Sequence, residues 1–201
     1  MKRRILLLSV IIPLHAAFSV AAPQTPRSTQ AASVSKFQRP SWSEAYKKEL
    51  FAKAQHGDTG AQFWLGSAYE QGWFGKTDFQ EALKWLRRAA EHGDPDAQNA
   101  LGQMCEDGEG VSQNHAQAAK WYRKAAEHVP DLGGAGQGRN NLGLLYMRGL
   151  GVPKDYAQAY MWFRLTNSET NLSYAKAQMT PTQVLEAEGM AAEWKSHHSG
   201  R

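Results

Sequence analysis

The sequence predicts an all-α protein: a right-handed α-solenoid of stacked antiparallel helix pairs, about 3.5 repeats long, closed by a C-terminal capping helix. Two short blocks recur along the chain and carry this prediction. The first block is marked by Leu65, Leu101 and Leu142, and the second by Trp85, Trp121 and Trp162. In both series the first step is 36 residues and the second is 41, so a single insertion of five residues separates the last two units. Repetition at such a period is the signature of a repeat array.

Each block has the apolar spacing of a helix. In the first unit, Ala61, Leu65, Ala68 and Tyr69 form one stripe, and a second stripe runs through Trp85. Glycine turns join the two blocks of each unit, and no Gly-Lys-Ser/Thr follows them, which argues against a phosphate-binding loop. The unit is therefore a helix, a turn and a helix. The glycine after the marker leucine should let the paired helix approach closely. The marker tryptophan should fill the space between units. A single helix pair cannot bury both of its faces, so neighbouring units must stack.

These blocks divide the chain into eight segments. They are a signal peptide (1–21), a flexible linker (22–40), an N-terminal half-repeat helix (41–57), repeat 1 (58–93), repeat 2 (94–129), a glycine-rich insertion (130–137), repeat 3 (138–170), and a C-terminal capping helix and tail (171–201). The glycines of the insertion predict a loose joint between repeats 2 and 3. Capping-box patterns predict two helix starts, Ser41 with Glu44 and Thr180 with Gln183.

The N-terminus has the layout of a secretory signal peptide. Basic residues 2–4 precede a short apolar run, and small residues at Ser19 and Ala21 predict cleavage after Ala21, with Ala22 or later as the alternative. A retained membrane anchor is the rival interpretation, but Pro13 and His15 interrupt a run too short to span a bilayer comfortably. We therefore expect a periplasmic or secreted protein.

Charge and cysteine content narrow the function classes. Without the leader the chain has twenty basic and nineteen acidic residues, so most of the positive net charge of the full sequence lies in the leader. The net charge is therefore weak support for binding to nucleic acid or an anionic membrane. Cys105 is the only cysteine, which excludes an intramolecular disulfide, and it is expected to be an inert core residue. His56, His92 and His128 recur in register but each falls in the last turn of a predicted helix, where it would cap carbonyl groups rather than bind a metal. His197 and His198 are expected to lie in a frayed polar end.

Residues 58–167 resemble the Sel1-like repeat (SLR) family, which is related to the tetratricopeptide repeats. The residues that carry the resemblance in the first unit are Ala61, Leu65, Gly66, Tyr69, Gly72, Ala82, Trp85, Ala89, Ala90 and Gly93. In the second unit they are Ala97, Leu101, Gly102, Gly108, Gly110, Val111, Ala118, Trp121, Ala125 and Ala126. In the third they are Leu142, Gly143, Tyr146, Gly149, Gly151, Val152, Asp155, Ala159 and Trp162. Three features depart from the pattern: Cys105 replaces the expected tyrosine, the glycine-rich insertion near residues 129–138 lengthens the junction, and residues 166–168 replace the usual Ala-Ala-x-x-Gly ending.

In arrays of this kind the first helix of each pair lines the concave face, so its residues outside the core stripe are the candidate partner contacts. They are Phe63, Ser67, Glu70, Gln71, Asn99, Gln103, Glu106, Asp107, Asn140, Leu144, Met147 and Arg148. The set is polar with an acidic middle, which would suit an extended peptide with a basic group. Asn99 and Asn140 occupy equivalent places and could hold a peptide backbone through their amides.

The resemblance implies a protein-interaction scaffold or adaptor, in envelope signalling or assembly, that binds a protein or peptide partner and needs no cofactor. Two alternatives stay open. One is a β-lactam-binding or hydrolysing enzyme, like a cysteine-rich branch of the family. The single cysteine, Cys105, and the lack of a recognisable catalytic motif in the sequence argue against this alternative. No catalytic or metal-binding residue is therefore assigned. The other is a secreted factor that interacts with a host protein.

Overall fold

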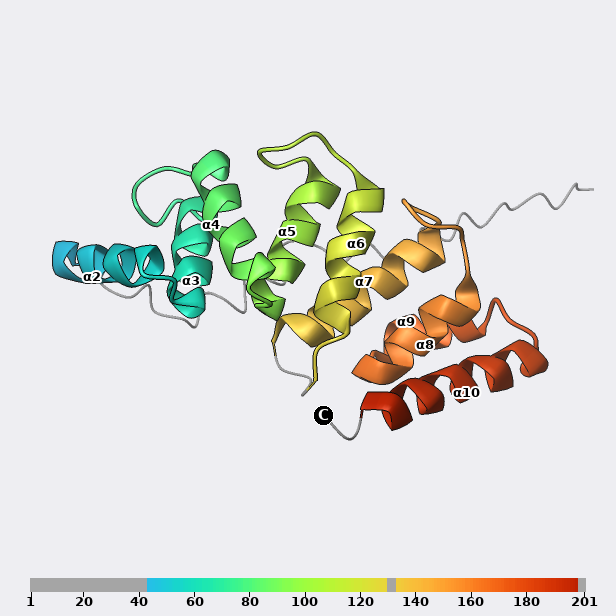
Figure 1. The fold of residues 1–201 in the computed structure, drawn as a ribbon. Helices are drawn as coiled ribbons and strands as arrows, with labels where there is room; N and C mark the ends of the chain where they lie inside the picture. The colour runs from blue at the N-terminus through green and yellow to red at the C-terminus, as the bar shows by residue number, and fades with distance from the viewer. Residues whose placement is uncertain (1–42, 130–132, 199–201) are drawn as a thin grey trace, which may run out of the picture. The chain divides into compact units, whose positions relative to one another are not determined.

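The computed structural model describes residues 43–129 and 133–198, and over these residues the protein contains helices and no strand (Figure 1). The predicted signal peptide and linker, and with them Ser41, lie outside the described residues. The helices are α2 (Glu44–Gln55), α3 (Thr59–Glu70), α4 (Phe79–Glu91), α5 (Pro95–Asp107), α6 (His115–Ala126), α7 (Gly134–Arg148), α8 (Tyr156–Thr166), α9 (Glu169–Lys176) and α10 (Pro181–His198). None of these helices is long and apolar enough to cross a membrane.

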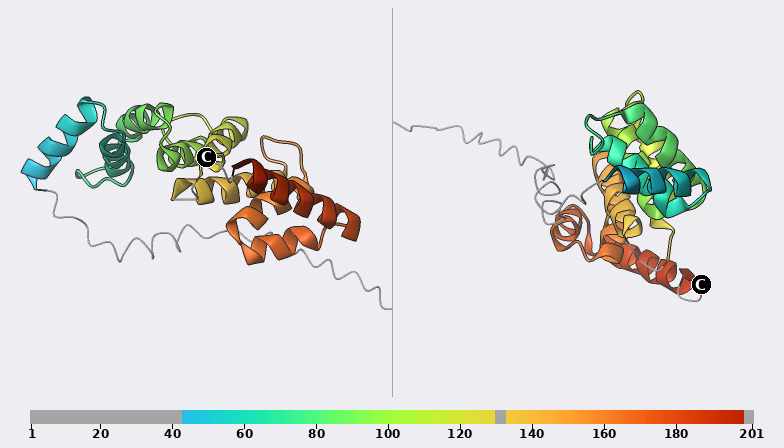
Figure 2. Two further views of the ribbon diagram at one scale, coloured as in Figure 1. Left: turned by 60° about the horizontal axis from the view of Figure 1, so that its bottom comes forward. Right: turned by 90° about the vertical axis from the view of Figure 1, so that its left-hand side faces the viewer.

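The helices pair in chain order, as the repeats predict. α3 packs on α4, α5 on α6, and α7 on α8, while α4 contacts α5 and α6 contacts α7 to join successive pairs. α2 packs on α3 at one end of the array, and α9 and α10 pack on α8 at the other (Figure 2). The predicted α-solenoid is confirmed.

Local capping explains where the helices begin. Asp58, Asp78, Asp94, Asn114 and Asp155 are N-caps whose side chains accept hydrogen bonds from first-turn backbone N–H groups. These bonds satisfy donors that have no partner inside the helix. The capping box at Thr180 is confirmed, because Thr180 N donates to Gln183 Oε1 at 2.9 Å and Gln183 N donates to Thr180 Oγ1 at 3.3 Å.

The predicted capping box at the first helix is wrong. α2 begins at Glu44, and its N-cap is Ser43, whose hydroxyl accepts from Tyr46 N at 3.2 Å. Glu44 is therefore the first helical residue and cannot occupy the third position, from which a capping-box glutamate reaches back. Only Ser41 has a glutamate three residues later, yet Ser43, two residues on, is the cap, so the capping-box pattern alone does not fix where this helix begins.

The marker glycines are points of close helix approach, as predicted. A Cβ on Gly102 would lie 2.4 Å from Tyr122 Cε1, and one on Gly143 would lie 2.6 Å from Phe163 Cε1. The residue that each glycine meets directly follows the marker tryptophan of the paired helix. Trp121 itself packs against the clusters on both sides of it, so the tryptophan joins neighbouring units.

Residues 133–138, the described part of the glycine-rich segment, pack closely against repeat 2, which differs from the predicted loose joint. α7 begins at Gly134, inside the predicted insertion, and Gly134 and Ala135 are buried. A Cβ on Gly134 would lie 2.2 Å from the carbonyl oxygen of Pro95, so the start of α7 lies directly against the start of α5. The glycines permit a close backbone contact between repeats.

The end of the array contains a helix that the sequence reading missed. α9 is short, with Asn171 and Ala175 buried, and it follows α8 after a turn at Asn167. Asn167 has φ of 53° and provides the left-handed helix end that glycine provides elsewhere in the array. The terminal helix α10 does cover repeat 3, since Ala187 and Ala191 are buried and α10 packs on α8.

Candidate protein-interaction surface

Hydrogen bonds between side-chain amides join the first helices of successive units. Asn99 Nδ2 on α5 donates to Gln137 Oε1 on α7 at 3.0 Å, and Asn99 Oδ1 accepts from Asn141 Nδ2 at 3.0 Å. One step along, Asn140 Oδ1 accepts from Asn171 Nδ2 on α9 at 3.0 Å. The two asparagines predicted to hold a peptide backbone are thus engaged within the array, and Asn99 is buried.

A second set of polar contacts lies three residues before each marker leucine. Gln62 Nε2 donates to Ala54 O and Gln98 Nε2 donates to Ala90 O, both at 3.0 Å. In the third unit the equivalent residue is Arg139, whose Nε donates to Ala126 O at 2.9 Å. Each side chain therefore satisfies a carbonyl group in the last turn of the preceding helix.

The remaining predicted contacts divide by exposure. Leu144 and Met147 are buried in the cluster that repeat 3 forms with α9 and α10, so they offer no accessible surface. Glu106 is half-buried and accepts a hydrogen bond from the Tyr122 hydroxyl at 2.8 Å, and burial together with this carboxylate raises the pKa of Tyr122 far above its usual range. The predicted contacts that keep exposed or half-exposed surface are Phe63, Ser67, Glu70, Gln71, Gln103, Glu106, Asp107, Asn140 and Arg148.

An aromatic group on repeat 1 extends this surface. Trp64 is 43% exposed, its ring lies 5.5 Å from that of Phe63, and it stacks on Trp73 at 6.4 Å between ring centroids. By helical spacing, Phe63 and Trp64 share a face of α3 with Ser67 and Gln71. We call Phe63, Trp64 and Trp73 the aromatic patch.

The sequence reading missed Trp64 and Trp73 although a signal was present. The units place Ala100 and Asn141 where repeat 1 has Trp64. Both equivalents face neighbouring helices: Ala100 is buried, and Asn141 bonds to Asn99 on the preceding first helix. A large aromatic residue at this position of the first unit marks a face without such a neighbour.

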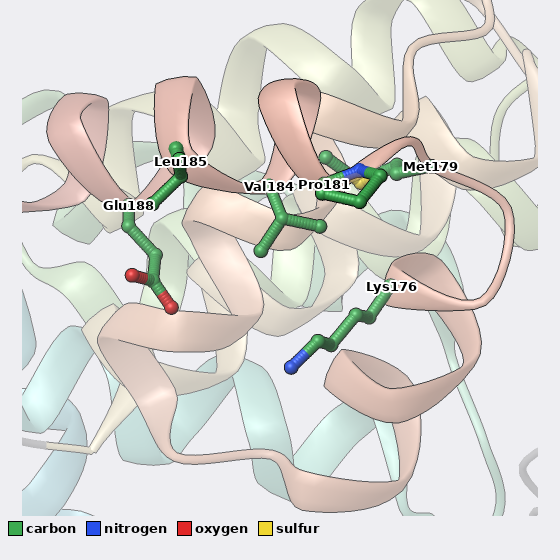
Figure 3. Close-up of a pocket in the computed structure, with 6 residues that line it drawn as sticks. All are labelled: Lys176, Met179, Pro181, Val184, Leu185 and Glu188. Carbon is green, nitrogen blue, oxygen red and sulfur yellow. The ribbon is translucent and has the colours of Figure 1, made fainter.

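An open cavity of about 440 Å³ lies at the other end of the array (Figure 3). Lys176 reaches towards it from α9, and Val184 and Glu188 from α10, with Met179 and Pro181 at its edge. Glu188 also accepts from the Tyr160 hydroxyl at 3.1 Å. Leu185 beside it is 69% exposed. The lining of the cavity combines the two charged residues Lys176 and Glu188 with apolar side chains.

A family model for the Sel1 repeat matches residues 59–94, 95–128 and 137–166. The chain belongs to the Sel1-repeat family. The first two matched segments contain the pairs α3–α4 and α5–α6, and the third covers α8 and all but the first three residues of α7. Solenoids of this family typically serve as non-catalytic scaffolds for protein interactions.

Two solved structures of Sel1-repeat proteins are similar to this chain. One is a protective antigen present in uropathogenic Escherichia coli strains and displaying an SLR fold; it is 26% identical, with a TM-score of 0.57 over 74% of this chain and 40% of that one. The other is a Sel1 repeat protein from Oxalobacter formigenes, 28% identical, with a TM-score of 0.55 over 73% of this chain and 55% of that one. The chain thus spans about half the length of these relatives or less. No curated protein matches the sequence.

Two of the three histidines that recur in register in this Sel1-repeat protein are helix C-caps, His56 at the end of α2 and His92 at the end of α4. His92 Nδ1 lies 2.7 Å from Arg88 O in the last turn of α4, as predicted. His198 is not part of a frayed end: its Nδ1 lies 2.7 Å from Trp194 O, and its ring stacks on Trp194 at 4.0 Å. Among the described residues, no three His, Cys, Asp or Glu side chains come together in a way that could hold a metal ion.

Proposed function

We propose that this Sel1-repeat protein is an exported scaffold that binds a protein partner on the first-helix face of repeats 1 and 2. The observation that carries the proposal is the aromatic patch, where Trp64 leaves 43% of its surface in water. Exposed apolar groups cost free energy that a partner can recover, and tryptophan is enriched among the residues that dominate binding. Ser67 and Gln71, on the same side of α3, provide a polar rim beside the patch, and Gln103 is the partly exposed equivalent of Ser67 in repeat 2.

Export is the second part of the proposal and rests on the N-terminal sequence. A basic start, a short apolar run and small residues before Ala22 are typical of a cleaved leader. Sequencing the N-terminus of the protein recovered from an osmotic-shock fraction should yield Ala22 or a residue shortly after it. Recovery in the cytoplasmic fraction with Met1 retained would overturn this part alone.

The binding face can be tested by site-specific photo-crosslinking in cells that produce the full chain. A photo-reactive amino acid at Gln71 should give a discrete crosslinked product, and the same group at the exposed Ala192 on α10 should not. Trp64→Ala should abolish the product, whereas Leu185→Ala removes an exposed apolar side chain elsewhere and should leave it unchanged. Equal products from both positions, or a product insensitive to Trp64→Ala, would refute the assignment of the face.

A host-directed role is the alternative that a specific finding favours, because one similar structure is that of a protective antigen in pathogenic Escherichia coli. It predicts that the protein is found in the medium or on the cell surface. Protease treatment of intact cells distinguishes this from a periplasmic scaffold, since a periplasmic protein survives the treatment. The enzymatic alternative predicts nitrocefin turnover by the purified protein, and we expect none.

A further inference from the structure

Cys105 occupies a position where both other repeats have tyrosine. It follows Tyr69 by 36 residues and precedes Tyr146 by 41, the same steps that separate the marker leucines. The substitution replaces a large aromatic ring with a small thiol in repeat 2 alone.

In the other repeats the tyrosine is packed into the array. The Tyr146 hydroxyl accepts a hydrogen bond from an Arg123 guanidinium nitrogen at 2.7 Å. The Tyr69 ring lies 6.3 Å from Phe51 and 5.2 Å from Phe74, both edge-on. By the repeat steps, Phe51 and Arg123 are the equivalents of Arg87. The position equivalent to Arg87 is thus a partner of tyrosine wherever tyrosine is present.

In repeat 2 this place is a cleft of about 350 Å³, bounded by α4, α5 and α6. Its walls are largely apolar and include Leu83, Leu101, Val111 and Trp121, with Cys105 among them. Arg87 lines the same cleft as Cys105. Burial raises the pKa of the Cys105 thiol, and the charge of Arg87 opposes that rise. Arg87 itself is exposed.

The two second helices that bound the cleft, α4 and α6, carry exposed cations. Lys84 and Arg88 on α4 are exposed, as are Lys120 and Lys124 on α6. Lys84 is paired with Glu81 at 2.9 Å, whereas α6 contains no acidic residue. Together α4 and α6 contain six basic residues and two acidic ones, Glu81 and Glu91, so the second-helix side of repeats 1 and 2 is basic, although the chain without its leader is close to neutral. Such a field attracts an acidic partner.

We propose that this cleft is a second interaction site, which binds an acidic segment of a partner protein by inserting one aliphatic side chain beside Trp121 and pairing a carboxylate with Arg87. The volume suits one or two side chains, at the lower end of the range for small binding sites. Arginine binds carboxylates in a planar, bidentate geometry. A nucleic acid or an anionic bilayer would use the cations of α4 and α6 but would leave the apolar walls empty, so the walls favour a protein segment.

The test uses the full chain and a fluorescein-labelled peptide that carries one leucine among aspartates and glutamates. Cys105→Tyr restores the residue of the other repeats and should fill the cleft, weakening peptide binding by about tenfold or more, while Cys105→Ala keeps the space and should bind as the parent does. Arg87→Gln should weaken binding about tenfold, whereas Arg164→Gln, the same change at the equivalent exposed position of repeat 3, should not.

Three results would overturn the proposal. One is equal binding by the Cys105→Tyr and Cys105→Ala variants when both melt cooperatively by circular dichroism. A second is equal affinity for a peptide whose leucine is replaced by glycine. The third is binding of a thymidine oligonucleotide or of phosphatidylglycerol vesicles that exceeds peptide binding and is unchanged in Cys105→Tyr, which would assign the surface to generic anions.

Cys105 is also an internal reporter that is independent of the folding of the tyrosine variant. It is the only cysteine of the sequence, so a small thiol reagent reads this position alone. Bound peptide should slow modification of the parent protein by methyl methanethiosulfonate severalfold; an unchanged rate at saturating peptide would place the peptide elsewhere. The cleft and the aromatic patch use different residues, so either site can fail its test without affecting the other.

Discussion

Different side-chain hydrogen bonds hold the two junctions between full repeats, the one between repeats 1 and 2 and the one between repeats 2 and 3, although both pack a first helix on the preceding second helix. At the first, Gln98 reaches back eight residues to one carbonyl oxygen, Ala90 O. At the second, five extra residues separate the helices, and Arg139 bonds both Ala126 O at 2.9 Å and His128 O at 2.7 Å. The longer, forked side chain spans the insertion, so an insertion in a repeat array need not loosen it.

The second junction also has contacts that the first lacks. Gly134 meets the backbone of Pro95, Asn99 links α5 to α7 through two amide bonds, and the Arg139 guanidinium lies 4.6 Å from the ring centroid of Trp194. Gln98 and Gln62 each leave a buried Oε1 atom without a protein partner. The interrupted junction is thus the more completely bonded of the two, and four pairs of substitutions test or calibrate this comparison.

The largest effect is expected at the backbone contact. Gly134→Ala would place a Cβ 2.2 Å from Pro95 O and should lower the free energy of unfolding by about 3 kcal/mol, because neither backbone can move without disturbing a helix start. Gly189→Ala is the matched control: it lies in α10 with open space around it and should stabilise by roughly 0.5–1 kcal/mol. Urea unfolding monitored by circular dichroism measures both. No loss in Gly134→Ala would show that the joint is loose after all.

The bridging arginine should have the next largest effect. Arg139→Gln should cost about 2 kcal/mol, because glutamine cannot satisfy both carbonyl groups across the insertion and loses the contact with Trp194. Gln98→Ala, which removes one bond at the first junction, should cost about 1 kcal/mol. Equal costs in urea unfolding would remove the distinction between the junctions.

The amide contacts between first helices should contribute less. Asn99→Ala removes two hydrogen bonds between α5 and α7 and should cost about 1–2 kcal/mol, compared with about 1 kcal/mol for Asn141→Ala, which removes one. Amide hydrogen exchange should become faster at the start of α7 in the first variant. If exchange increases only in α5, the amide pairs do not couple the two repeats.

Caps at the two ends provide the baseline for these comparisons. Thr180→Ala removes a reciprocal capping box and should cost about 1 kcal/mol, whereas Ser43→Ala removes a single 3.2 Å cap bond on an exposed helix start and should cost about 0.5 kcal/mol. The melting temperature should shift in the same order. A larger loss from Ser43→Ala would imply that α2 anchors the array more strongly than its packing on α3 indicates.

Sequence reasoning was most accurate where the relevant contacts are local or periodic. The 36-residue step, the glycine close to the paired helix and the capping box at Thr180 all depend on residues near one another or on repetition, and all are present in the structure. The candidate surface was harder to predict. Helical spacing placed Asn99 on the first-helix face, but its exposure depends on α7, which follows it by more than thirty residues.

The sequence by itself determined the kind of protein: an array of helix pairs with its turns, its marker contacts and one odd residue, Cys105, in an otherwise repeated position. Only the tertiary structure decided what the departures from the repeat do. It turned the glycine-rich insertion into a backbone contact, made Arg139 a bridge, and left a cleft where Cys105 replaces tyrosine. The physical reason is that repetition specifies contacts within a unit, whereas a departure acts through neighbours that lie far away in the chain, and their distance and direction depend on how the helices stack.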